Sequence, residues 1–177
     1  QNAGQIDEKV KFLARGSGYT LFLTRDEAAF AFAGAKKDKQ KAASEVVMMK
    51  LTGANTAADI SGENLLEGKT NYINGSDPSD WKTDIASYER VRYSNVYDGI
   101  DIVYYGNQKQ LEYDFVVSPN ADPGSIKLEF SGADKIRIDS HNDLILRTKT
   151  GTVRLQKPRI YQDIEGEQIT VEGRYVI

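Results

Sequence analysis

The sequence predicts an all-β protein: an antiparallel β-sandwich of two packed sheets with roughly a dozen or more strands. Three observations favour this fold. The chain is rich in β-branched and aromatic residues, which suit a half-buried pleated surface. Apolar and polar residues alternate over much of its length, and turn residues interrupt the alternation about every 8 to 12 positions. So many strands exceed what one flat open sheet carries comfortably, so two packed sheets are expected. The length of the chain predicts a single domain over residues 1–177.

Four strands are expected in the first part of the chain, at residues 9–15, 19–24, 27–33 and 44–51. Gly16 and Gly18 favour a tight turn between the first two. Residues 34–43 are rich in lysine and predict a solvated loop, with an anionic-ligand patch as the other interpretation.

The middle of the chain, around residues 52–83, predicts one long irregular connection. Asp77 and Pro78 favour a capped helical turn within it. Trp81 would pack this connection onto the body of the protein, or alternatively offer a stacking surface to a sugar. We take Trp81, Tyr97 and Tyr105 as candidate ligand-binding residues.

From residue 87 onward the sequence is nearly all strand. Alternation is clear at residues 111–117 and recurs at 126–130, 136–138, 144–146, 153–155 and 169–171. Turn residues separate these runs at 98–99, 106–108, 140–143, 150–151 and 165–166.

Most catalytic templates are absent from the sequence. The chain has no cysteine, and its only histidine, His141, lies in a predicted turn between Ser140 and Asp143, a poor position for a general base. We find no nucleophile elbow, no phosphate-binding glycine loop and no metalloprotease motif. A glycosidase needs only two suitably spaced carboxylates, and the chain has 26 acidic residues, so a glycosidase stays an alternative interpretation.

The charge balance argues against two further classes. With 23 basic and 26 acidic residues the formal charge is −3, so no basic surface for nucleic acid is expected. No apolar stretch is long enough for a membrane span. The chain opens with Gln1 rather than Met, as expected of a processed or excised polypeptide.

A carboxylate cluster is predicted where residues 106–109 join two strands. If Tyr105 pairs with Gln110, Asp101 lies directly opposite Asp114, with Glu112 nearby. Opposed like charges destabilise a sheet, so a cation is expected there. Arg90 or Arg92 is the favoured cation, and a bound Ca²⁺ is the alternative; we otherwise expect no metal and no cofactor.

Several long stretches resemble a known family. They are Asn2–Gln5, Val10–Tyr19, Phe22–Thr24, Gly68–Tyr72, Asp77, Pro78, Trp81, Tyr88–Val117, Ala121–Pro123, Pro158 and Ile160–Gln162. Together they are similar to the uncharacterised N-terminal domain that precedes SBBP-type β-propeller repeats in large exported bacterial proteins. The resemblance implies a secreted or cell-surface bacterial protein, followed by such repeats, and it carries no catalytic residues.

These observations predict a non-catalytic extracellular module. It would cap or orient the repeats that follow in the same chain, or bind a surface protein or glycan. The alternative is a carbohydrate-active enzyme with paired carboxylates on a β-sandwich. Ile169, Val171 and residues 175–177 predict an exposed apolar edge at the end of the chain, so we expect a longer polypeptide to melt at a higher temperature.

Overall fold

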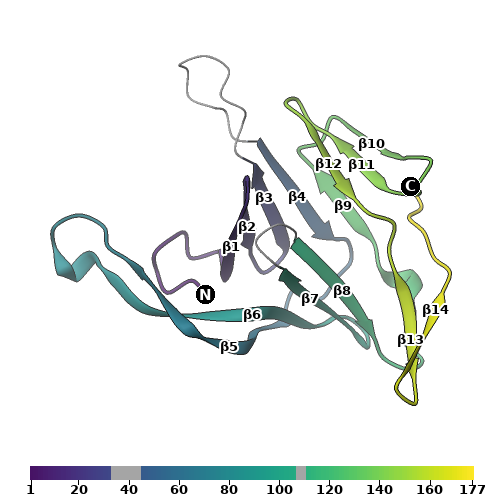
Figure 1. The fold of residues 1–177 in the computed structure, drawn as a ribbon, viewed down its shortest axis with the longest axis horizontal. Helices are drawn as coiled ribbons and strands as arrows, with labels where there is room; N and C mark the ends of the chain where they lie inside the picture. The colour runs from purple at the N-terminus through teal and green to yellow at the C-terminus, as the bar shows by residue number, and fades with distance from the viewer. Residues whose placement is uncertain (33–44, 107–110) are drawn as a thin grey trace. The chain divides into compact units, whose positions relative to one another are not determined.

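The computed structural model describes residues 1–32, 45–106 and 111–177, and these residues form an all-β protein. Within them lie fourteen strands in four antiparallel sheets, consistent with the predicted β-sandwich, and two single-turn 3-10 helices (Figure 1). The chain divides into two compact units. Among the described residues, the first unit takes 1–32 and 46–131, and the second takes Glu45 and 132–177.

The first unit contains a five-stranded sheet in the order β1-β2-β3-β4-β9. Its strands are β1 (Phe12–Gly16), β2 (Tyr19–Leu23), β3 (Glu27–Phe32), β4 (Glu45–Leu51) and β9 (Leu128–Ser131). The four strands predicted for the first part of the chain are therefore confirmed, with ends that differ by at most three residues. The lysine-rich stretch 34–43 lies outside the described residues.

The first unit also contains a four-stranded sheet in the order β5-β6-β7-β8. Its strands are β5 (Asp59–Tyr72), β6 (Lys82–Tyr97), β7 (Ile100–Gly106) and β8 (Leu111–Val117). β5 and β6 are long and continue as a ribbon beyond the two shorter strands (Figure 1). The helix η1 (Pro78–Asp80) lies at the tip of this ribbon, and η2 (Pro123–Ser125) follows β8.

The two sheets of the first unit share one hydrophobic core. Leu21 and Met49 come from the five-stranded sheet, and Ile100 and Ile102 from the four-stranded sheet; each is at most 1% exposed. The Tyr97 hydroxyl stabilises one side of the core, because it donates its single hydrogen to the Thr52 carbonyl oxygen at 3.1 Å and accepts the backbone N–H of Lys127 at 3.3 Å. This packing of two antiparallel sheets is the sandwich arrangement that the alternation predicts.

The prediction of a long irregular connection around residues 52–83 is wrong, because fourteen of these residues form β5. β5 carries little apolar alternation of its own and is held by pairing with β6, with register shifts between Leu65 and Tyr72. Gly62 allows the ring of Tyr88 to lie directly over the backbone, where a Cβ atom would come within 2.4 Å of the ring. The predicted capped turn is confirmed, since the Asp77 carboxylate accepts the N–H of Ser79.

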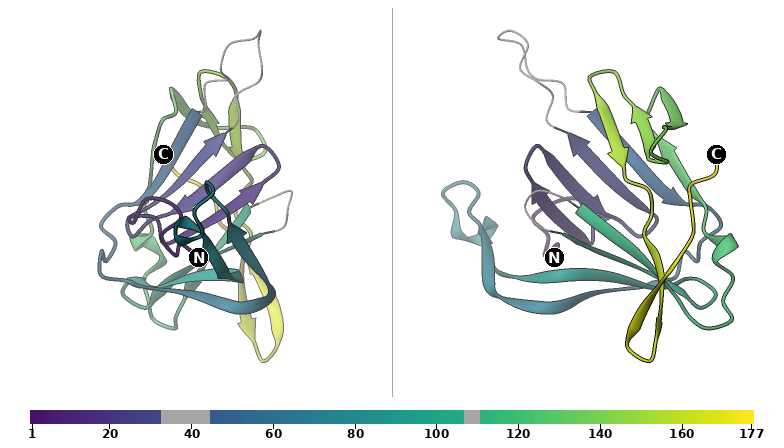
Figure 2. Two further views of the ribbon diagram at one scale, coloured as in Figure 1. Left: turned by 90° about the vertical axis from the view of Figure 1, so that its left-hand side faces the viewer. Right: turned by 45° about the vertical axis from the view of Figure 1, so that its right-hand side comes forward.

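The second unit consists of two small antiparallel sheets. Three strands, β10 (Lys135–Ile138), β11 (Leu144–Arg147) and β12 (Thr152–Leu155), pair in sequence order. The remaining two, β13 (Ile160–Ile164) and β14 (Glu167–Val171), form a separate hairpin. This hairpin of β13 and β14 is visible in Figures 1 and 2. Glu165 and Gly166 join its strands, and both have positive φ, as the tight two-residue turn requires.

Candidate functional site

One face of the four-stranded sheet carries a network of charged side chains. The guanidinium of Arg92 on β6 contacts the carboxylate of Glu63 on β5 and lies 3.0 Å from the carboxylate of Asp101 on β7. All three side chains are about one third exposed or less. The hydrogen bond to Glu63 raises the pKa of Arg92, and Asp101 adds to this effect. Arg92 thus bridges two acids and neutralises one of their charges.

The register of β7 and β8 differs from the predicted one. Val103 pairs with Asp114 and Tyr105 with Glu112, while Asp101 lies opposite Val116. The predicted direct opposition of Asp101 and Asp114 is therefore wrong. The expected pairing of Tyr105 with Gln110 is wrong as well, since Tyr105 pairs with Glu112; residues 107–110 themselves lie outside the described residues.

Asp114 and Arg90 meet at Tyr105 instead. The Tyr105 hydroxyl donates to the Asp114 carboxylate at 2.8 Å, and the Arg90 guanidinium lies over the Tyr105 ring, 5.3 Å from its centre. Asp101 and Asp114 of the predicted cluster therefore have different partners. Asp101 pairs with Arg92, and Asp114 accepts a hydrogen bond from Tyr105. Within the described residues no group of three or more acids or histidines could hold a metal ion.

The three candidate ligand-binding aromatic residues lie in different environments. Tyr97 is only 9% exposed and belongs to the core, so its ring presents no open face to a ligand. Trp81 is half-buried at the end of η1, where its indole N–H reaches the Gly75 carbonyl at 3.4 Å. Tyr105 takes part in the charged face described above. The structure does not bring these residues together into one site.

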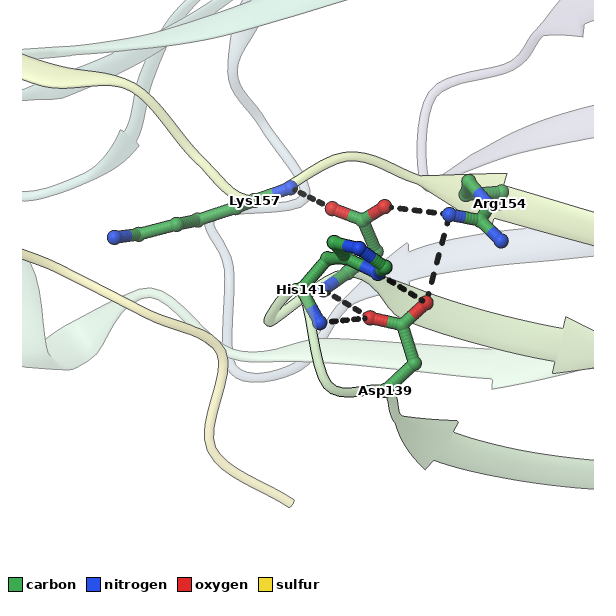
Figure 3. A network of polar contacts seen from close by, with 5 residues as sticks. Asp139, His141, Arg154 and Lys157 are labelled. Atoms are coloured by element: carbon green, nitrogen blue, oxygen red, sulfur yellow. Dashed lines mark hydrogen bonds and ion pairs between the residues drawn. The ribbon is translucent and has the colours of Figure 1, made fainter.

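A second polar network fastens the turn between β10 and β11 in the second unit (Figure 3). The Asp139 carboxylate accepts the backbone N–H groups of His141 and Asp143, and lies 3.5 Å from Arg154. Asp143 is only 8% exposed; its carboxylate accepts Arg154 at 2.9 Å and the backbone N–H of Lys157 at 2.8 Å. The network therefore ties the turn to β12 and to the chain that follows it.

The surroundings of Asp139 favour its ionised form. Partial burial opposes the charge on Asp139, but the N–H groups of His141 and Asp143 and the charge of Arg154 outweigh it, so the Asp139 pKa is lowered. The His141 side chain is 78% exposed, and its ring lies 3.9 Å from Asp139. His141 is thus a surface turn residue. The contacts of Asp139 and Asp143 stabilise the turn, and they lack the sheltered histidine that a catalytic acid and base would need.

Sequence reasoning missed three members of these networks. Glu63 was not predicted because its strand shows little periodicity, although the alternation of Ile60 and Gly62 with Ser61 and Glu63 is a short strand signal. Arg154 and Lys157 were not predicted, because their contacts with Asp143 depend on how the turn between β10 and β11 packs against β12 and the residues after it. No local sequence pattern indicates this packing.

The β13–β14 hairpin of the second unit exposes several large apolar side chains. Every residue of both strands is exposed. The register pairs Ile160 with Val171 and Ile164 with Glu167. Because side chains alternate between faces, Ile160, Ile164, Ile169 and Val171 share one face with the polar Gln162 and Glu167, while Tyr161, Asp163, Gln168 and Thr170 share the other. We call the first of these the apolar face of the hairpin.

The fold and these networks define an all-β domain whose polar clusters are internally paired. The whole chain, residues 1–177, matches the family model described as a domain of unknown function, DUF7948. The chain therefore belongs to this family. No curated protein and no solved structure matches it. Among the described residues, no helix is long and apolar enough to cross a membrane.

Proposed function

We propose that this domain is a non-catalytic module of an exported or surface-attached bacterial protein, and that it acts by docking onto another protein element through the apolar face of β13–β14. The observation that carries the proposal is the exposure of this face: its four apolar side chains are 38% to 49% exposed. An isolated two-stranded hairpin is at best marginally stable in water, so a covering element would stabilise it.

The sequence of the hairpin supports a docking role. Alternation of apolar and polar residues is the pattern of a strand with one covered face, yet here that face is open. Exposed contiguous apolar surface commonly marks a contact with another protein. The resemblance to the domain that precedes SBBP-type repeats suggests the partner: β-propeller-type repeats of the same polypeptide, which the module would cap or orient. A surface protein or glycan is the other candidate partner.

The state of the acidic residues argues against the carbohydrate-active alternative. A general acid at neutral pH needs a raised pKa, whereas hydrogen bonds lower the pKa of Glu45, Asp77 and Asp139. The pairs Glu63 and Asp101, and Asp139 and Asp143, each share one arginine in an ion-pair network. No observation on these residues favours hydrolysis.

Amide hydrogen exchange tests the docking role. Exchange over residues 160–171 is compared between this chain and the longest natural polypeptide that contains it. We expect slower exchange of the hairpin in the longer protein, and loss of that protection in Ile164→Ser/Ile169→Ser, which removes two side chains of the apolar face. Thr170→Ser, on the opposite face, is the matched control. Equal exchange in the two polypeptides would contradict docking in the same chain, and glycoside hydrolysis by the purified domain would favour the enzyme.

A further inference from the structure

The outer edge of β13 is open. β13 pairs only with β14 in the described structure, so its other side presents unpaired backbone groups. We propose that two copies of this chain pair through this edge, with β13 of one copy antiparallel to β13 of the other and Gln162 on the two-fold axis. The proposal goes beyond the proposed function, because it uses the edge of the hairpin and leaves the apolar face free.

Backbone geometry permits this register. Ile164 and Glu167 close a two-residue turn and so form a hydrogen-bonded pair. Along an antiparallel ladder such pairs alternate, so Ile160, Gln162 and Ile164 direct their N–H and C=O groups to β14. Tyr161 and Asp163 direct theirs to the open edge. A two-fold axis at Gln162 places Tyr161 opposite Asp163 of the second copy, so the outward groups meet in hydrogen-bonded pairs.

The side chains of β13 are self-complementary about the same axis. Ile160 comes opposite Ile164 of the second copy, and Arg159, which directly precedes β13, comes near Glu165 in the turn of the second copy. Symmetry repeats each pair, giving two opposite-charge pairs and two apolar pairs, with Gln162 facing its own copy at the centre. Arg159 and Glu165 are exposed and form no ion pair within the described residues. Opposite charges and apolar residues directly opposed across strands stabilise a sheet.

The open edge of β14 lacks this complementarity. An axis at Ile169 would place the Glu167 carboxylate opposite Val171 of the second copy, with no opposite charge to meet it. Charge and register thus both select the β13 edge.

A charge exchange tests the pairing. Within one hairpin Arg159 precedes β13 and Glu165 follows it, so the length of the strand separates them and we expect them to interact only between copies. The dimer fraction is measured by sedimentation velocity over rising protein concentration. Arg159→Glu and Glu165→Arg should each weaken dimerisation about tenfold, because each replaces two attractive pairs with two repulsive ones. The double variant Arg159→Glu/Glu165→Arg restores opposite charges at both sites and should dimerise like the natural chain.

Arg174→Glu, an exposed charge reversal beyond β14, is the matched control and should leave the dimer unchanged. Circular dichroism verifies that each variant is folded. A chain that stays monomeric up to about 1 mM would overturn the proposal, as would a dimer that the single reversals do not weaken or the double variant does not restore. Hydrogen exchange of the apolar face is independent of these results, so failure of the edge pairing and failure of the docking role are distinguishable.

Discussion

Replacing Asp143 is expected to loosen the second unit more than its small side chain suggests. The Asp143 carboxylate is nearly buried and accepts one hydrogen bond from Arg154 and one from the Lys157 backbone. Asp143→Ala removes both acceptors and leaves the Lys157 N–H without its partner. Hydrogen bonds to charged groups contribute about 1.5 to 3 kcal/mol each, but Arg154 is 55% exposed, so we discount its share. The expected loss is about 2 to 3 kcal/mol.

Native-state hydrogen exchange measures this loss locally, at Lys157 and along β11 and β12. Asp143→Asn is the matched control: it keeps an oxygen for the Lys157 N–H but loses the charge that faces Arg154, so its cost should be about 1 kcal/mol. If Asp143→Ala lowers the free energy of opening by less than about 0.5 kcal/mol, the proposed role of this carboxylate in stabilising the turn is refuted. Equal costs for the two variants would show that the charge, rather than the backbone hydrogen bond, stabilises the turn.

Two further predictions concern single positions. Gly62→Ala places a Cβ 2.4 Å from the Tyr88 ring and should destabilise the first unit by about 1 to 3 kcal/mol in urea unfolding, whereas Gly68→Ala, which meets no atom within 4 Å, should cost less than 1 kcal/mol. Hydrogen bonds from Thr148 and Thr150 lower the pKa of Glu45. Its stabilising contribution is therefore present above the unfolded-state pKa and disappears as pH falls through the lower folded-state pKa; Glu45→Gln should flatten this part of the acid unfolding profile.

The sequence predicted strands well where one face is apolar. β8 alternates Leu111, Tyr113 and Phe115 with acidic residues, and the structure places it as expected. β5 escaped prediction because pairing with β6 determines its conformation, and its polar residues resemble those of a loop. Local pattern therefore identifies strands that bury their own side chains and misses strands that depend on a neighbour.

The charged face shows the same limit at the level of single contacts. Arg92 and Asp101 were named together from the sequence, and they lie 3.0 Å apart. The predicted register of β7 and β8 differs from the observed one by two residues, since Asp101 pairs with Val116 and not with Asp114. The register depends on the length of the connection between the strands, which the sequence pattern did not determine. A two-residue shift keeps the side chains on the same face, so the face was predicted although the pairing was not.

A single cysteine at the centre of β13 tests the inferred use of this hairpin most directly. The natural chain has no cysteine, so Gln162→Cys introduces a unique thiol on the proposed two-fold axis. Non-hydrogen-bonded residues opposed across antiparallel strands have Cα atoms about 4.5 Å apart, within the range of a disulfide. We predict that Gln162→Cys forms a disulfide-linked dimer under mild oxidation and that Arg159→Glu slows it, while Gln168→Cys on β14 stays monomeric. Equal cross-linking at the two positions would contradict the pairing.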